Sequence, residues 1–115
     1  KAHRVETTDG PLYTVRCEAI FNEHKAVYRS ALVGVGANRY AQVPVIIIEA
    51  HPERVPTTSA AQDELTTELL ALGAESPLTR TIHRVLFHRS FPVDIRHNAK
   101  IKREVLAAWA ETQPI

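Results

Sequence analysis

The segment Val43–Ala50 constrains the fold of this chain more than any other. It contains Val43-Pro-Val-Ile-Ile-Ile48, a run that is apolar on both faces and mostly β-branched. Such runs are typical of a strand in the middle of a sheet that is covered on both sides. Pro44 cannot donate a ladder hydrogen bond, so it must lie at the start of the strand or at an unpaired position. Because the run is far shorter than the ~20 apolar residues of a membrane-spanning helix, we expect no transmembrane segment.

The other periodic patterns predict further strands and three helices around this one. Residues 27–35 alternate in polarity and end near glycines, which predicts a second long strand, and residues 81–87 predict a third. Short extended pieces at 3–6 and 12–13 flank a turn at Asp9-Gly10-Pro11. The order ββαββαβα is typical of an α+β domain. We therefore predict an α+β fold with a small three-stranded sheet, a short N-terminal two-stranded piece, and helices packed on the sheet.

Each expected helix is marked by a capping residue and an apolar stripe. The predicted ranges with their caps are 14–23 (Thr14), 59–73 (Ser59, in a capping box with Gln62) and 98–111 (Asn98). Gly73 is expected to stop the middle helix. The expected buried faces are Cys17, Ile20 and Phe21, then Leu65, Leu69 and Leu72, and finally Ile101, Val105, Ala108 and Trp109.

The size and charge of the chain exclude several classes of function. Its 115 residues correspond to one domain, and a net charge of +1 creates no broad field for nucleic acid or a membrane surface. The single cysteine, Cys17, cannot form an internal disulfide, so we expect a cytoplasmic protein. The first residue is Lys1 rather than Met, and we expect the chain to be a fragment of a longer protein.

The segment with the most chemical potential is Arg96-His97-Asn98-Ala99-Lys100. Its cationic side chains open the predicted last helix. A helix N-terminus offers free N–H groups and the positive end of a dipole, so this segment is expected to bind an anion such as a phosphate or carboxylate. A lysine about 4 Å from an oxyanion contributes about 4 kcal/mol at an effective dielectric of about 20, enough to stabilise a transition state. The alternative from composition alone is a set of ordinary solvated loop charges.

Neither the histidines nor the cysteine indicates another catalytic site. The six histidines show no zinc-ligand spacing, and His83 and His88 would point to opposite faces of the predicted third strand. No metal site is therefore predicted. Cys17 is expected to be an apolar filler rather than a nucleophile. The chain contains no glycine-rich phosphate loop, so it is not expected to bind a nucleotide on its own.

Several phrases, taken in order, resemble the C-terminal domain of the adenylate-forming superfamily, which includes acyl-CoA synthetases, luciferases and peptide-synthetase adenylation domains. The phrases are His3-Arg-Val5, Gly10, Thr14-Val-Arg-Cys-Glu18, His24-Lys-Ala-Val-Tyr-Arg-Ser-Ala-Leu-Val-Gly-Val35, Val43-Pro-Val45, Pro92 and Asn98-Ala-Lys100. The resemblance covers essentially all 115 residues, with these phrases in the same order as in the superfamily.

Some positions depart from the superfamily pattern. Ala99 stands where Gly is usual, Arg16 where Glu is common and Thr14 where Pro is frequent, and the loop before Lys100 is longer. The segment 91–101 is similar to the bacterial olefin-biosynthesis branch, whose members are β-lactone synthetases often labelled fatty-acid–CoA ligases. The change at Arg16 is compatible with an altered second half-reaction.

The resemblance implies that the chain is a lid. In the family, a large N-terminal domain binds ATP, Mg²⁺ and a carboxylic acid, and the small domain closes over that site. Its lysine, here Lys100, reaches the acid's carboxylate and the α-phosphate. Lys100 is thus the expected catalytic residue, with Arg96, His97, Asn98 and Gly10 expected to contact substrate or nucleotide. The Gly10 turn would face the site after the lid rotates.

The same resemblance implies a choice of second step. CoA ligases form a thioester, whereas in the β-lactone branch the hydroxyl of a 3-hydroxy fatty acid attacks the acyl-adenylate, and no CoA is needed. The expected partners are the chain's own N-terminal domain, a fatty or 3-hydroxy fatty acid, and other hydrocarbon-biosynthesis enzymes; the isolated chain is expected to be inactive. Two other classes remain open: a stand-alone anion-binding module, and a structural or interaction domain in which the β-rich surface and Trp109 bind a partner.

Overall fold

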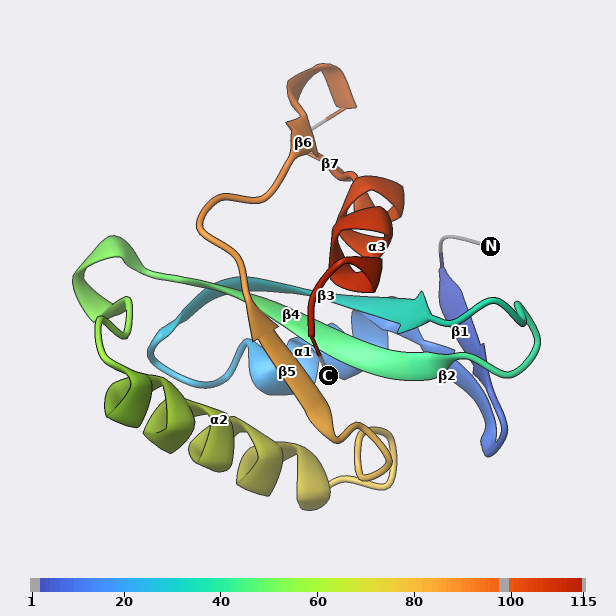
Figure 1. Ribbon diagram of the computed structural model, residues 1–115, viewed down its shortest axis with the longest axis horizontal. Helices are drawn as coiled ribbons and strands as arrows, with labels where there is room; N and C mark the ends of the chain where they lie inside the picture. Colours follow the sequence, from blue (N-terminus) through green and yellow to red (C-terminus); the bar gives the residue numbers. More distant parts are fainter. Residues whose placement is uncertain (1–2, 98–99, 115) are drawn as a thin grey trace.

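The computed structural model describes residues 3–97 and 100–114, and a three-stranded sheet lies at its centre (Figure 1). The strands are β3 (Val27–Val35), β4 (Val43–Ala50) and β5 (Arg84–Phe87), in the order β3-β4-β5. β4 is antiparallel to β3 and parallel to β5. The prediction of a central strand over 43–50 is confirmed, and Pro44 lies near its start, opposite Gly34.

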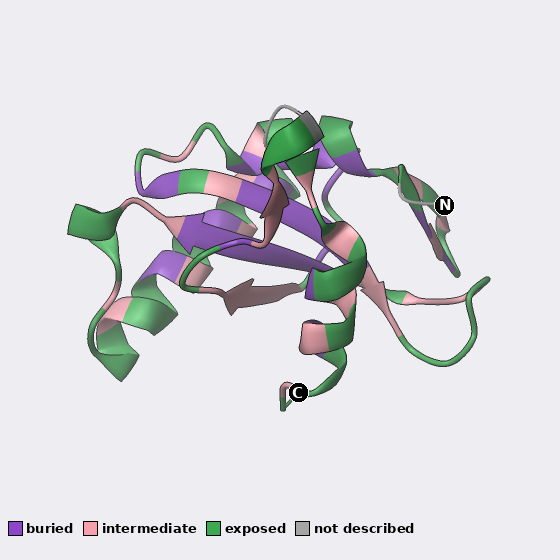
Figure 2. Cartoon of the chain, turned by 90° about the horizontal axis from the view of Figure 1, so that it is seen from above, coloured by how far each residue is buried: buried purple, intermediate pink, exposed green. Residues whose placement is uncertain are grey.

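Successive residues of β4 contribute to cores on the two faces of the sheet. Ile46 and Ile48 belong to one buried cluster, whereas Val45 and Ile47 belong to a second. All four residues are 0% exposed, and Figure 2 shows burial concentrated along the central strands. Because neighbouring strand residues point to opposite faces, a sheet covered on both sides requires an unbroken apolar strand. Burying each of these side chains contributes roughly 2 kcal/mol.

Different parts of the chain cover the two faces. The helices are α1 (Thr14–Phe21), α2 (Ser59–Ala74) and α3 (Arg103–Glu111). α1 and α2 contribute to the first cluster, and α3 contributes to the second. α2 follows a short 3₁₀ turn, η1 (Pro52–Arg54), in the connection from β4 to β5. This connection must cross over one face because the two strands it joins are parallel.

Two short hairpins extend from the layered body (Figure 1). The first pairs β1 (Arg4–Thr7) with β2 (Gly10–Tyr13). The second consists of β6 (Val93–Asp94), the 3₁₀ turn η2 (Ile95–His97) and β7 (Lys100–Ile101); we call it the arm. The predicted α+β class, the small sheet and the N-terminal pair are confirmed. β6 and η2 lie between the predicted strand over 81–87 and the predicted helix over 98–111, in a stretch for which the sequence predicts no helix or strand.

The limits of α1 differ from the predicted ones. The helix ends at Phe21, and Tyr13 rather than Thr14 is its N-cap, without a side-chain hydrogen bond. The Thr14 hydroxyl instead donates to the carbonyl of His3 (3.2 Å). Thr14 is 1% exposed, so its hydroxyl serves to join the helix to the N-terminal hairpin.

The cap of α2 lies one position earlier than expected. Thr58 accepts a hydrogen bond from the Ala61 N–H (3.0 Å), so the predicted capping box of Ser59 with Gln62 is wrong. Gly73 lies inside the helix and does not stop it. It is a packing requirement there, because a Cβ would lie 2.9 Å from Cζ of Phe21.

The third strand and the last helix also differ from expectation. β5 begins at Arg84, so His83 and His88 flank the strand rather than lie on it. On α3 the buried residues are Leu106 and Ala110, whereas the predicted Val105 is 47% exposed. The predicted Ala108 is exposed as well, and only Ile101 and Trp109 of that set pack against the core. Ile101 lies on β7 and not in the helix, so it is not part of the helical face that Leu106 and Ala110 form.

Candidate functional site

Lys100 lies on a strand of the arm and not at the start of a helix. α3 begins at Arg103, and its N-cap is Lys102, with no side-chain cap. The predicted cap, Asn98, lies outside the described residues and well before this start. The expected placement of Lys100 at a helix N-terminus is therefore wrong, because a hairpin presents the lysine instead, whereas anion binding by this segment stays a prediction.

Strand pairing within the arm decides which way Lys100 faces. Val93 pairs with Ile101, and Asp94 pairs with Lys100. Val93 and Ile101 pack against the core cluster under α3, whereas Lys100 is exposed. Because neighbours on a strand point to opposite sides, the packing of Ile101 turns Lys100 outward. Among residues 3–97 and 100–114, none forms a hydrogen bond or ion pair with the Lys100 ammonium.

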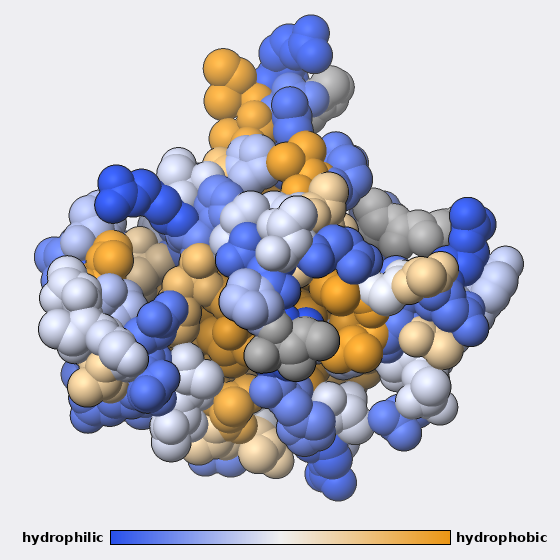
Figure 3. Space-filling model, viewed as in Figure 1, coloured by the Kyte–Doolittle hydropathy of each residue, from blue (hydrophilic) through white to orange (hydrophobic). Residues whose placement is uncertain are grey.

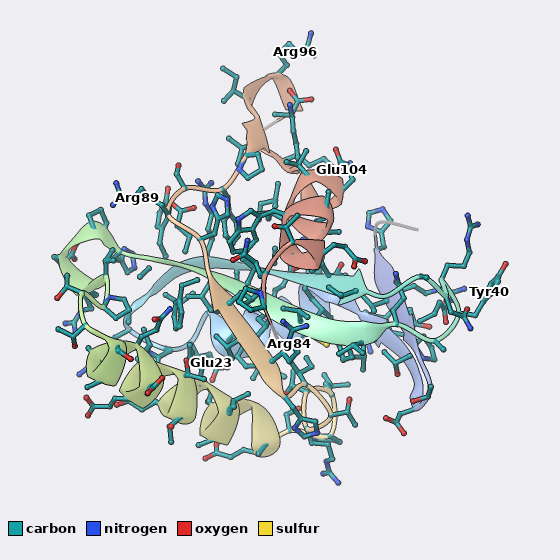
Figure 4. All side chains as sticks on the ribbon, in the orientation of Figure 1. Glu23, Tyr40, Arg84, Arg89, Arg96 and Glu104 are labelled. Carbon is teal, nitrogen blue, oxygen red and sulfur yellow. The ribbon has the colours of Figure 1, made fainter. Side chains whose placement is uncertain are left out.

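Arg96 lies at the outer end of the arm, with its side chain pointing away from the body (Figure 4). That side chain is 86% exposed, and its Nε lies 3.7 Å from Oδ1 of Asp94, which also accepts the Arg96 N–H (3.0 Å). Ile95 beside it is 81% exposed. The tip thus combines a cation with an apolar side chain, and Figure 3 shows both colours there. The predicted roles of Asn98 and of the His97 side chain lie outside the described residues.

Gly10 belongs to the other hairpin and is not brought to the arm (Figure 1). It pairs with Thr7, whose hydroxyl donates to the Gly10 carbonyl (2.7 Å). Its φ of 110° is a conformation that L side chains rarely adopt, so a glycine is required in this turn. Of the predicted site residues that the structure describes, Arg96 and Lys100 therefore lie on the arm and Gly10 lies on the N-terminal hairpin.

A buried ion pair holds the chain directly after the arm. Arg103 Nε lies 2.9 Å from Oε2 of Glu18, and its Nη2 lies 2.5 Å from Oε1. The same Oε2 accepts the backbone N–H of Leu32 on the edge strand β3 (2.8 Å). Glu18 is 5% exposed. The carboxylate therefore ties α3, α1 and β3 together at one point.

The amino-acid sequence does not predict this ion pair. Glu18 is adjacent to Cys17, on the buried face of α1. A charged residue within a buried helical stripe is a signal that a partner exists, because an unpaired buried charge is very unfavourable. The sequence does not identify that partner, because Arg103 lies 85 positions away.

Cys17 is a protonated, buried thiol. Burial, and secondarily the Glu18 carboxylate, raise the pKa of Cys17 from its ordinary value of 9.0 to about 11. Its Sγ donates to the carbonyl of Leu78 (3.4 Å). A nucleophilic cysteine needs a lowered pKa, so this environment agrees with the predicted role as an apolar filler.

Comparisons with known proteins bear on the whole chain. No family model matches it. An olefin β-lactone synthetase of Xanthomonas campestris pv. campestris is 52% identical over 115 residues, which are 100% of this chain and 20% of that protein. An olefin β-lactone synthetase of Stenotrophomonas maltophilia is 47% identical over 113 residues, covering 98% and 19%. The chain thus spans about a fifth of the length of the curated relatives it matches.

Solved structures show the same fold. An ATP-bound RpMatB–BxBclM chimera matches 96% of this chain and 21% of its own, with a TM-score of 0.77 and 18% identity. The anthranilate CoA ligase AuaEII, in complex with anthranoyl-AMP, matches 95% and 20%, with a TM-score of 0.74 and 21% identity. The resemblance to the C-terminal domain of the adenylate-forming superfamily is confirmed. At these identities the solved structures establish the fold of the domain, and the curated relatives indicate the branch.

Across the part of the chain that the structure describes, no cluster of three or more His, Cys, Asp or Glu side chains could hold a metal ion. None of the helices within residues 3–97 and 100–114 is long and apolar enough to cross a bilayer.

Proposed function

We propose that residues 1–115 are the mobile C-terminal lid of an ATP-dependent, AMP-forming acid ligase, and that Lys100 is its catalytic residue. The observation that carries the proposal is the exposed Lys100 ammonium, which has no protein partner among the described residues and is held outward by the packing of Ile101. The 52% identity to part of an olefin β-lactone synthetase supports the class of enzyme.

The physical role of Lys100 follows from the charge of the reactants. When a carboxylate attacks the α-phosphate of ATP, two anions approach each other while pyrophosphate leaves. A cation near both oxygens offsets this repulsion most strongly in the transition state. A hairpin arm is a suitable carrier, because the lysine must enter and leave the site as the lid moves.

The other predicted residues have supporting roles in this proposal. Arg96, His97 and Asn98 would contact the nucleotide or the acid from the arm, and Gly10 would approach the site when the lid rotates for the second step. The large domain would bind most of the ATP and the Mg²⁺ that neutralises phosphate charge. This chain contributes the lysine and the surface that excludes water.

We propose that the acid is a fatty or 3-hydroxy fatty acid. In the β-lactone route, the substrate's own 3-hydroxyl oxygen bonds to the acyl carbon of the adenylate and AMP leaves, which closes the ring without CoA. In the thioester route the sulfur of CoA takes that place. The two relatives named olefin β-lactone synthetase favour the first route. Product analysis of the full-length protein with a 3-hydroxy acid, with and without CoA, distinguishes them.

The decisive test replaces Lys100 in the full-length protein. Lys100→Ala should lower acid-dependent ATP–pyrophosphate exchange by at least about 100-fold, as expected for loss of one oxyanion-stabilising group. Lys102→Ala is the matched control, because this exposed lysine lies just beyond the arm and should leave exchange unchanged. Normal exchange in Lys100→Ala would contradict the assignment.

The isolated chain provides a second test. A lid should show no exchange activity and negligible nucleotide binding, because the large domain is missing. A stand-alone anion-binding module would instead bind ATP or phosphate by itself in calorimetry. Turnover by residues 1–115 alone would overturn the proposal.

A further inference from the structure

Glu49 is a buried carboxylate at the end of the most apolar strand of the protein. It directly follows Ile46, Ile47 and Ile48 on β4 and is 8% exposed. A charge in such a place is retained only where its partners compensate for the lost hydration. The identity of those partners therefore indicates what the carboxylate is for.

The two partners of Glu49 come from different parts of the fold. Its Oε1 accepts a hydrogen bond from Nε of Arg29 (2.5 Å), which lies directly opposite on β3. The same oxygen accepts the backbone N–H of Phe91 (3.0 Å). Phe91 lies beyond β5, at the root of the arm. Glu49 therefore joins the rigid centre of the sheet to the segment from which the arm begins.

The root of the arm is fixed further around this hydrogen bond. Phe91 is 3% exposed, and its ring lies 5.6 Å from the Arg29 guanidinium and 5.9 Å from the ring of His88. Next along the chain, the Pro92 carbonyl accepts the Lys102 N–H (3.0 Å), which closes the arm at its base. A displacement of Phe91 would thus pass directly to both strands of the arm.

We propose that Glu49 is a positioning residue for Lys100. By holding the Phe91 amide, it sets the point and the direction in which the arm leaves the sheet, and the hydrogen bond from Arg29 keeps the Glu49 carboxylate oriented toward that amide. This inference rests on the proposed function, in which Lys100 must reach anions bound by another domain. Glu49 itself contacts no substrate. A displacement of about 1 Å at a catalytic group can lower the rate about 100-fold, so the position of Phe91 at the root of the arm affects the reaction at Lys100.

Three variants of the full-length protein separate this role from general stability. Glu49→Leu removes both hydrogen bonds. Glu49→Gln retains a carbonyl oxygen that can accept the Phe91 N–H but loses the ion pair. Glu68→Gln is the control, since this half-exposed carboxylate on α2 pairs with His24, away from the arm. Each variant is assayed for acid-dependent ATP–pyrophosphate exchange and for amide hydrogen exchange at Phe91, Lys102 and, as an internal reference, Ile47.

We expect a local effect in Glu49→Leu. Phe91 and Lys102 should lose protection while Ile47 keeps it, and the kcat for exchange should fall about 10- to 100-fold with the KM for ATP within about twofold. The KM for ATP should stay nearly unchanged because the large domain binds most of the ATP. Glu49→Gln should keep Phe91 protected and kcat within about threefold of the parent, and the control should match the parent in both measurements.

Several outcomes would overturn the inference. Equal loss of protection at Ile47 and Phe91 in Glu49→Leu would show general destabilisation. An unchanged kcat in a variant whose Phe91 amide is unprotected would show that the hydrogen bond to Glu49 has no catalytic consequence. If Glu49→Leu does not fold, the test rests on Glu49→Gln. In that variant, lost protection of the Phe91 amide with a normal kcat would refute the positioning role. Intact protection with a strongly reduced kcat would refute it as well. Hydrogen exchange can be measured without the reaction. A Phe91 amide that stays protected in Glu49→Leu would therefore refute the role of Glu49 in holding the arm, even if Lys100→Ala disproves the proposed function.

Discussion

Arg103 and Glu18 form a buried bidentate ion pair that joins the first residue of α3 to the middle of α1. Both oxygens of the carboxylate are used, at 2.9 and 2.5 Å, and the side chains are 15% and 7% exposed. Glu18 also satisfies the Leu32 N–H on the edge strand β3. The pair thus provides an acceptor for one N–H of that strand and fixes the chain just after the arm.

Removal of one partner should therefore be costly. Arg103→Ala leaves the Glu18 charge buried without compensation, and we expect a loss of about 3–5 kcal/mol in the free energy of unfolding. Arg96→Ala is the control, because its ion pair is long and its side chain is 86% exposed; its effect should stay below about 0.5 kcal/mol. Urea unfolding of the isolated domain measures both, and equal effects in the two variants would contradict the assignment.

The position of the α2 cap predicts opposite results for two adjacent residues. Thr58→Ala removes the oxygen that accepts the Ala61 N–H, so stability should fall by about 1 kcal/mol. Ser59→Ala should change it by less than about 0.3 kcal/mol, because Ser59 is the first helical residue and alanine has high helix propensity. Thermal unfolding of both variants, followed by circular dichroism, checks the pair. A larger loss of stability in Ser59→Ala than in Thr58→Ala would instead support the capping box that the sequence predicted.

The raised pKa of Cys17 predicts a pH dependence of stability. Because the pKa is raised to about 11 in the folded protein, the fold favours the protonated thiol. The stability that this thiol contributes is fully present below about pH 9 and is lost as pH rises towards 11. One pKa unit corresponds to about 1.4 kcal/mol, so the loss should reach about 2–3 kcal/mol.

Cys17→Ala isolates that contribution from other groups that titrate in the same range. The difference in unfolding free energy between the parent and Cys17→Ala should shrink by this amount between pH 8.5 and pH 11. In the folded parent, Cys17 should also resist alkylation at pH 8, because almost no thiolate is present. A difference that does not change with pH, or rapid alkylation of the native protein, would argue against a buried thiol.

Much of the layered body could be predicted because its signals are local. The apolar run of β4 identified the central strand, and the alternation over residues 27–35 identified β3, since each pattern reflects the burial of that segment alone. The predicted limits of helices were wrong where packing against a residue distant in the sequence is involved. Gly73 reads as a helix stop in the sequence, yet it lies within α2, where the ring of Phe21 leaves no room for a Cβ.

The sequence by itself determined the α+β class, the central strand and the basic character of the segment that contains Lys100, because composition and periodicity are properties of contiguous residues. Only the tertiary structure decided that Lys100 lies on a hairpin arm, and that Glu18 and Glu49 hold the chain on either side of it. Their partners, Arg103 and Phe91, lie 85 and 42 positions away. The physical reason is that a buried charge reveals the need for a partner, whereas the packing of the sheet determines which distant residue fills that need.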